Sequence, residues 1–321
     1  MSIAELPGQI QIRDSFEGEP FTIRRLEPHE PHTSLGCVIT ISGNQVPQFE
    51  TLETKIQDWK ARITASTLKG DEKLTAYDSY LKESMKYVLP TTCLTKYQCA
   101  ELDKIIAPVL LNALSTHRKV SRIVLYSPER HGGYGVFDVW HLQGCEKLKY
   151  FIMHYRRHDI TGQLLKISLQ WLQMEAGVST PFYKFEYDMI EDILTNCWIK
   201  HLYWYLDSCK AKLHEVHPWT YTAPRENDFF LQEVFINSDL PRARVTLLNE
   251  VRMALRLITV SDIVAINKSS LVLPYIYECK NYRGSTLEWP RCEEINDNWK
   301  SIWKKCCSNN DSSYSKKKAT W

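Results

Sequence analysis

Glycine is scarce in this sequence, with 12 residues among 321. Neither glycine-rich nucleotide fingerprint, GxxxxGK[ST] or GxGxxG, occurs, so no ordinary nucleotide-binding loop is predicted. The serine-hydrolase motif GxSxG is missing too, and no cysteine and histidine are paired in a context typical of a nucleophile and its base. The sequence therefore offers no catalytic constellation, and we predict neither a catalytic residue nor a bound cofactor.

Long apolar runs and targeting signals are also lacking. No run approaches the roughly 20 residues needed to span a bilayer, and charged residues interrupt residues 1–30, so no signal-peptide core can form. The ten cysteines include no CxxC pair, and several fall on expected helix faces, where cysteine acts as a small hydrophobe. We expect reduced thiols and an intracellular protein, nuclear or cytoplasmic, with no membrane partner.

Strong net charge is absent as well. The formal charge is +2 and the pI is near 8.0, values too mild to identify a nucleic-acid-binding protein by themselves. Hydrophobic residues make up 44% and charged residues 24% of the chain, which is typical of a globular protein. Any basic surface must therefore be local.

What the chain does contain is a series of helix-like apolar stripes. The first places Leu52, Ile56, Trp59 and Ile63 at helical spacing, and a second stripe runs from Leu74 until Pro90 stops it. Further helices are expected at 96–112, 139–155, 161–176, 189–209, 227–237 and 242–258. We predict a mainly α fold, a multi-helix bundle with a short N-terminal β hairpin within 33–43 and few other strands.

The segments between the expected helices contain signals for strands and for helix ends. Residues 122–126, RIVLY, are expected to form a short strand, and 271–279 an extended segment. Asp138 and Thr161 are candidate N-caps for the helices that follow them, and Gly177 is the expected stop of the second of these helices.

The stretch HGGYGVFDVWHLQG (131–144) holds a quarter of all glycines, with Gly132, Gly133 and Gly135 inside five positions. Its place between an expected strand and a helix suits an anion-binding helix N-terminus. The simpler interpretation is a tight turn in which glycine provides positive φ and close backbone approach. We favour the structural turn.

A local basic region surrounds this cluster. Residues 115–160 contain eight Lys or Arg and four Asp or Glu, for a local charge of +4, with histidines and aromatic residues interleaved. Cations neutralise phosphates and aromatic rings stack on unpaired bases, so the region is a candidate nucleic-acid surface; a solvated face over an aromatic core is the alternative. The candidate residues are Arg118, Lys119, Arg122, Arg130, Lys147, Lys149, Arg156 and Arg157.

A histidine pair and an acidic stretch are weaker candidates for functional sites. His154 and His158 lie one helical turn apart but have no third ligand at a suitable spacing, so no metal site is predicted. The acidic stretch 185–192 precedes an expected helix, where carboxylates favour the helix dipole.

The order of several motifs resembles the region downstream of the polymerase core in reverse transcriptases of non-LTR retrotransposon-like elements. The glycine cluster is followed by TGQLLKISLQWLQ, WIKHLYWYL, RENDFFLQEVF and LNEVRMALRLITVSDI, and the resemblance covers about 33–303. It implies that Leu35 and Gly36 form the hairpin that follows the catalytic palm. The implied organisation is a β-rich segment at 1–48, a thumb-like region at 49–130 and a helical extension at 131–303. The composition of 304–321, rich in Ser, Asn and Lys, predicts a disordered basic tail.

The metal-binding palm motif YxDD of that family does not occur, and the 33 residues before Ser34 cannot supply it. The resemblance therefore implies a non-catalytic fragment that binds RNA or DNA without sequence preference, with a separately encoded palm as a candidate partner. Alone, it should show no primer extension, because two-metal phosphoryl transfer needs carboxylates that the sequence does not assemble. A stand-alone intracellular helical interaction module and a relic without function remain open alternatives.

Overall fold

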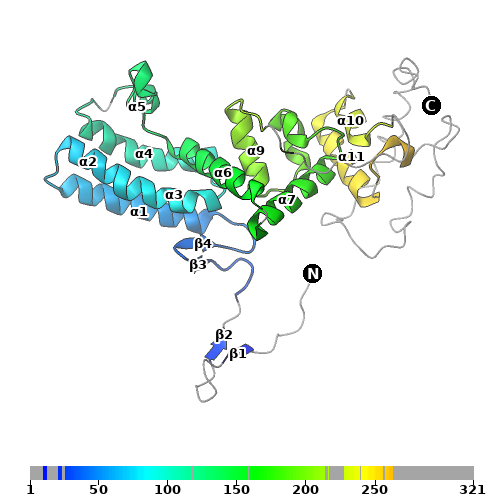
Figure 1. Cartoon of the computed structure of the whole chain (residues 1–321), viewed down its shortest axis with the longest axis horizontal. Coiled ribbons are helices and arrows are strands. Elements are labelled where there is room, and N and C mark those ends of the chain that lie inside the picture. The colour runs from blue at the N-terminus through cyan, green and yellow to red at the C-terminus, as the bar shows by residue number, and fades with distance from the viewer. Residues whose placement is uncertain are drawn as a thin grey trace. The chain divides into compact units, whose positions relative to one another are not determined.

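A computed structural model gives the fold, and it describes residues 10–12, 21–23, 26–117, 119–157, 159–213, 216, 228–238, 240–255 and 257–262. Helices dominate this part of the chain, and its strands all precede residue 40 (Figure 1). The predicted mainly α fold with an N-terminal hairpin is confirmed. The chain divides into two compact units, Met1–Glu146 and Lys147–Trp321. The predicted extended segment at 271–279 and tail at 304–321 lie outside the described residues.

Two antiparallel ribbons begin the first unit. β1 (Ile10–Ile12) pairs with β2 (Phe21–Ile23), and β3 (His32–Ser34) pairs with β4 (Cys37–Ile39). Leu35 and Gly36 form the two-residue turn of the second ribbon, with φ of 49° and 81°. Positive φ at both positions is the condition for a type I′ hairpin turn, which matches the twist of the paired strands. The predicted Leu-Gly hairpin is thus present.

The core of the first unit is helical. α1 (Val46–Ala65) packs against α4 (Lys96–Ala113), and α4 also contacts α2 (Gly70–Ala76). The predicted stripe on α1 is buried, with Ile56 fully inaccessible, and Trp59 meets the ring of Tyr77 edge-on with centroids 6.0 Å apart. The predicted helical hairpin is confirmed, although Leu74 is only half-buried.

The second helical segment contains an irregularity. α2 passes directly into a π-helix, η1 (Tyr77–Lys82), and then into α3 (Glu83–Val88). The α-helical part ends at Val88, and Pro90 falls inside a short 3-10 turn, η2 (Leu89–Thr91), as expected for a residue without a backbone N–H. π-helices are rare and often lie at functional sites.

α6 (Val139–Arg156) and α7 (Ile160–Ala176) follow the glycine cluster. Asp138 caps α6 as predicted, because its carboxylate accepts the N–H of His141 at 2.8 Å. The N-cap of α7 is Asp159, which accepts the N–H of Gly162 at 2.7 Å, so the cap predicted at Thr161 was wrong by two residues. α7 ends at Gly177 in the left-handed conformation, as predicted.

In the second unit, α7 packs against α9 (Trp198–Ser208). The helix expected at 189–209 is divided into α8 (Tyr187–Ile190), the 3-10 turn η5 (Glu191–Ile193) and α9. Two more helices, α10 (Leu231–Ile236) and α11 (Arg242–Leu255), contact each other.

The end of α7 is held by a buried arginine from α11. Arg252 donates to the carbonyl of Glu175 at 2.7 Å, to that of Leu257 at 3.3 Å and to Asn249 Oδ1 at 2.8 Å. Burial lowers the pKa of the Arg252 guanidinium to about 10, which still leaves it charged at neutral pH. A cation near a helix C-terminus interacts favourably with the partial negative charge at that end of the helix, so the Arg252 side chain caps α7.

Candidate nucleic-acid interface

The glycine cluster forms a compact turn. Gly132 and Gly135 have φ of 80° and 65°, and a Cβ at Gly133 would lie 2.0 Å from the carbonyl oxygen of Ser127. Two of the three glycines thus provide left-handed backbone and the third permits close approach. These are the two roles that the structural-turn interpretation assigned to them.

The backbone amides of this turn are already in use. Tyr134 N donates to Val124 O at 3.0 Å, Gly135 N to Ser127 O at 2.8 Å and Val136 N to Leu125 O at 3.2 Å. The amides of residues 131–133 likewise donate to backbone carbonyls of residues 128–129. A phosphate-cradling loop needs amides that point outward and lack partners. This loop therefore does not bind phosphate through its backbone.

The segment before the turn corrects one prediction. Residues 122–126 form a short helix, α5 (Arg122–Tyr126), rather than a strand. Ser121 accepts the N–H of Ile123 through its hydroxyl and so caps the first turn, while the glycine loop folds back on the carbonyls of Val124 and Leu125. Ile123 and Val124 favour strands by propensity, but the cap and the loop contacts hold this segment as a helix.

We name residues 117–137 of the first unit, apart from Arg118, the basic loop; Arg118 lies outside the described residues. Lys119, Arg122 and Arg130 are exposed there, and no carboxylate in the described chain pairs with them. Two aromatic side chains are also accessible, Tyr134 at 37% and Phe137 at 50%. The basic loop thus contains three exposed cations and two accessible aromatic rings.

The other predicted cations belong to the second unit. Lys149, Arg156 and Arg157 are exposed on the C-terminal part of α6 and just after it. Lys147 is fully buried, with its Nζ 5.0 Å from the centre of the Trp198 ring, so it is not available to a phosphate. The expectation that Lys147 contributes to a basic surface was wrong, because helical spacing turns it toward α9 rather than toward solvent.

Histidine and acidic groupings have structural partners. His154 Nδ1 lies 2.9 Å from Asp159 Oδ2, while His158 lies outside the described residues. Arg242 forms ion pairs with Glu191 at 3.3 Å and Asp192 at 2.5 Å, and so ties the acidic stretch to α11. Among the described residues, no group of three or more potential ligands is placed to hold a metal ion. No helix in this part of the chain has both the length and the apolar character to cross a membrane.

Two buried polar side chains fix the start of α6 in the first unit. Gln143 accepts from the hydroxyl of Thr92 at 2.9 Å and from Leu94 N at 3.0 Å, and donates back to Leu94 O at 3.1 Å. The carboxylate of Asp103 accepts the N–H of Val139 at 3.1 Å. Burial, with a smaller effect of Asp138, raises the pKa of the Asp103 carboxyl to about 8. These contacts hold the helix that follows the basic loop.

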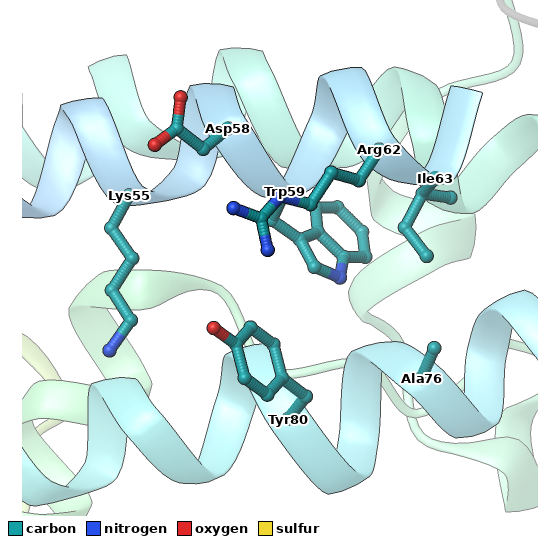
Figure 2. A pocket seen from close by; sticks show the side chains of 7 residues that line it. All are labelled: Lys55, Asp58, Trp59, Arg62, Ile63, Ala76 and Tyr80. Atoms are coloured by element: carbon teal, nitrogen blue, oxygen red, sulfur yellow. The ribbon is translucent and has the colours of Figure 1, made fainter. Parts of the chain in front are cut away.

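A groove between α1 and the α2–η1 segment was not found from the sequence. It has a volume of 280 Å³ and is lined by Lys55, Asp58, Trp59, Arg62, Ile63, Ala76 and Tyr80 (Figure 2). The apolar stripe identified Trp59 and Ile63 as core, but Lys55, Arg62 and Tyr80 were not singled out from the sequence. A signal does exist, since positions 55, 59 and 62 share a helix face and combine two cations with an aromatic ring.

Comparisons with protein families, with curated proteins and with solved structures found no match to this chain.

Proposed function

We propose that this chain is a non-catalytic, helical nucleic-acid-binding protein of the kind expected for the post-palm region of a reverse transcriptase. The observation that supports binding is the basic loop, where Lys119, Arg122 and Arg130 are exposed without acidic partners beside the accessible rings of Tyr134 and Phe137. Cations of this kind contact phosphates without regard to base sequence. The link to reverse transcriptases depends on the motif order and the Leu35-Gly36 hairpin.

Salt dependence tests this proposal directly. Binding of a labelled RNA or DNA oligonucleotide is measured by fluorescence anisotropy over a range of salt concentrations. We expect weak binding that declines steeply with salt, because phosphate contacts release condensed counterions. Replacing Lys119, Arg122 and Arg130 with alanine should reduce the slope of log K against log salt by roughly two to three units, about 0.7–0.9 per lost contact.

A matched control changes the net charge equally. Lys184, Lys210 and Arg244 are exposed cations of the second unit, and their replacement by alanine should leave most of the slope intact. No binding at low salt, or equal slopes in the two triple variants, would contradict the proposed function.

One observation favours the alternative of a protein-interaction module. Ile160, Leu164 and Ile167 on α7 are 77%, 58% and 59% exposed and lie on one face at spacings of four and three. Exposed apolar stripes often mark contacts with other proteins. A concentration-dependent rise in sedimentation coefficient that is lost in Leu164→Glu would support this alternative, and a monomer at all concentrations would contradict self-association.

A further inference from the structure

The groove between α1 and η1 combines side chains that would suit a polyanion with aromatic parts. Lys55 and Arg62 lie two turns apart on α1, about 10 Å along its axis. Tyr80 faces them from η1, and Figure 2 shows the three side chains entering the space between the two helices. The groove is thus bordered by two cations on one side and a phenol ring on the other.

The two cations are available to an anion. Neither Lys55 nor Arg62 forms an ion pair or a side-chain hydrogen bond within the described part of the chain. Asp58 lies between them on α1, but it pairs with neither, and in Figure 2 its carboxylate points away from η1. With Lys55 and Arg62 positive and Asp58 negative, the lining carries one net positive charge, and no ion pair within the described residues engages either cation.

Two aromatic side chains shape the groove. Trp59 forms a buried wall at 4% exposure, and its Nε1 has no hydrogen-bond acceptor in the described chain. Tyr80 is 56% exposed and projects from the π-helix, a geometry that is rare in proteins. An exposed ring beside unpaired cations provides a stacking surface for a planar group.

The volume of the groove indicates the size of the ligand that it can hold. At 280 Å³ it lies just below the range of about 300–1,000 Å³ that is usual for pockets enclosing a small molecule. The exposure of Tyr80 leaves the groove open to solvent along one side. Such a site suits one unit of a polymer that continues beyond it.

We propose that this groove holds one nucleotide of a single-stranded RNA or DNA, with its flanking phosphates at Lys55 and Arg62 and its base against Tyr80. This inference rests on the proposed function and adds a preference for unpaired strands, since a base inside a duplex cannot stack on a protein ring. Single-strand-binding proteins combine backbone cations with aromatic rings in this manner.

Substitution of the ring is the first test. Affinity of the full chain for a labelled single-stranded oligonucleotide is measured by anisotropy for Tyr80→Ala, Tyr80→Phe and Tyr87→Ala. Tyr87 is the matched control, because it is 57% exposed and lies two turns further along the same helical segment. We expect about 5- to 100-fold weaker binding for Tyr80→Ala, little change for Tyr80→Phe, which keeps the ring, and little change for Tyr87→Ala.

Substitution of the cations is the second test. The double variant Lys55→Gln/Arg62→Gln should reduce the salt slope for single strands by about 1.4 units, or 0.7 for each lost phosphate contact. Lys60→Gln, on α1 but outside the groove lining, serves as the control. Photocrosslinking of unmodified protein to an oligonucleotide containing 4-thiouridine should label Tyr80, a result that does not depend on how any variant folds.

The outcomes separate the two proposals. If Tyr80→Ala and Tyr87→Ala bind the single strand with equal affinity, the proposed groove site is wrong and the basic loop remains the binding surface. Tighter binding of a duplex than of a single strand would lead to the same conclusion. Absence of binding to any nucleic acid overturns both.

Discussion

Replacement of Arg252 by methionine tests whether the buried cap of α7 stabilises the second unit. Methionine matches the stem of the arginine side chain but lacks the charged guanidinium and its donors, so the carbonyls of Glu175 and Leu257 and the Oδ1 of Asn249 lose their hydrogen bonds. An unsatisfied buried acceptor costs about 1–3 kcal/mol, partly offset because no cation needs to be desolvated. We expect a net loss of about 3–5 kcal/mol.

Hydrogen exchange is the suitable assay, because a chain of two units need not unfold in a single step. A loss of this size should accelerate exchange in the last turn of α7 by at least about 100-fold, since 1.4 kcal/mol corresponds to a factor of ten. Protection in α1 and α4 is the internal reference, as none of the lost bonds lies there.

Two further arginine variants serve as controls. Arg244→Met removes an exposed arginine from the same helix and should change stability by less than about 0.5 kcal/mol. Arg252→Lys keeps the charge but loses the planar fork of donors, so its effect should be intermediate. If Arg252→Met and Arg244→Met exchange alike, the guanidinium does not stabilise the end of α7.

Three other predictions concern the first unit. Gly133→Ala should disrupt the basic loop, seen as loss of its amide protection, because its Cβ would overlap the carbonyl of Ser127; wild-type protection would contradict this geometry. Asp103→Asn should flatten the pH dependence of the unfolding free energy. Because the pKa of Asp103 is raised in the folded protein, the wild-type free energy of unfolding should fall as the pH rises from about 4 to about 8 and then level off. The fall is at most about 1.4 kcal/mol per pH unit. Parallel urea-denaturation curves for both proteins across pH 4–8 would refute that assignment. Leu35→Asn should raise the thermal midpoint, since asparagine tolerates positive φ better than leucine; a lower midpoint would show that Leu35 makes contacts that outweigh the backbone strain.

The helical part of the fold was predictable because burial follows a simple period. The stripe of Leu52, Ile56, Trp59 and Ile63 identified α1, and the glycine after α7 marked the end of that helix. Local propensity failed at residues 122–126, where strand-forming side chains are held in a helix by a cap and by the loop that folds back on them. Tertiary contacts decided that segment.

The candidate site was less predictable for a physical reason. Composition located the basic region, but whether a cation faces solvent depends on the helix phase, which placed Lys147 inside and Lys149 outside. The groove lined by Lys55, Arg62 and Tyr80 joins two segments whose facing surfaces are set by packing and by a π-helix that no periodicity reveals. Buried polar anchors such as Arg252 depend on partners far along the chain.

The close approach of Gly133 to Ser127 limits which residues related sequences can carry at this position. Buried helical positions accept many apolar residues of similar volume, so related chains can keep α1 and α4 while sharing few identities. Position 133 is different, because any side chain would displace the carbonyl six residues earlier. A distant relative should therefore retain glycine there, with glycine two positions later where φ is positive, and this spacing would identify such a relative after the helices have lost their resemblance.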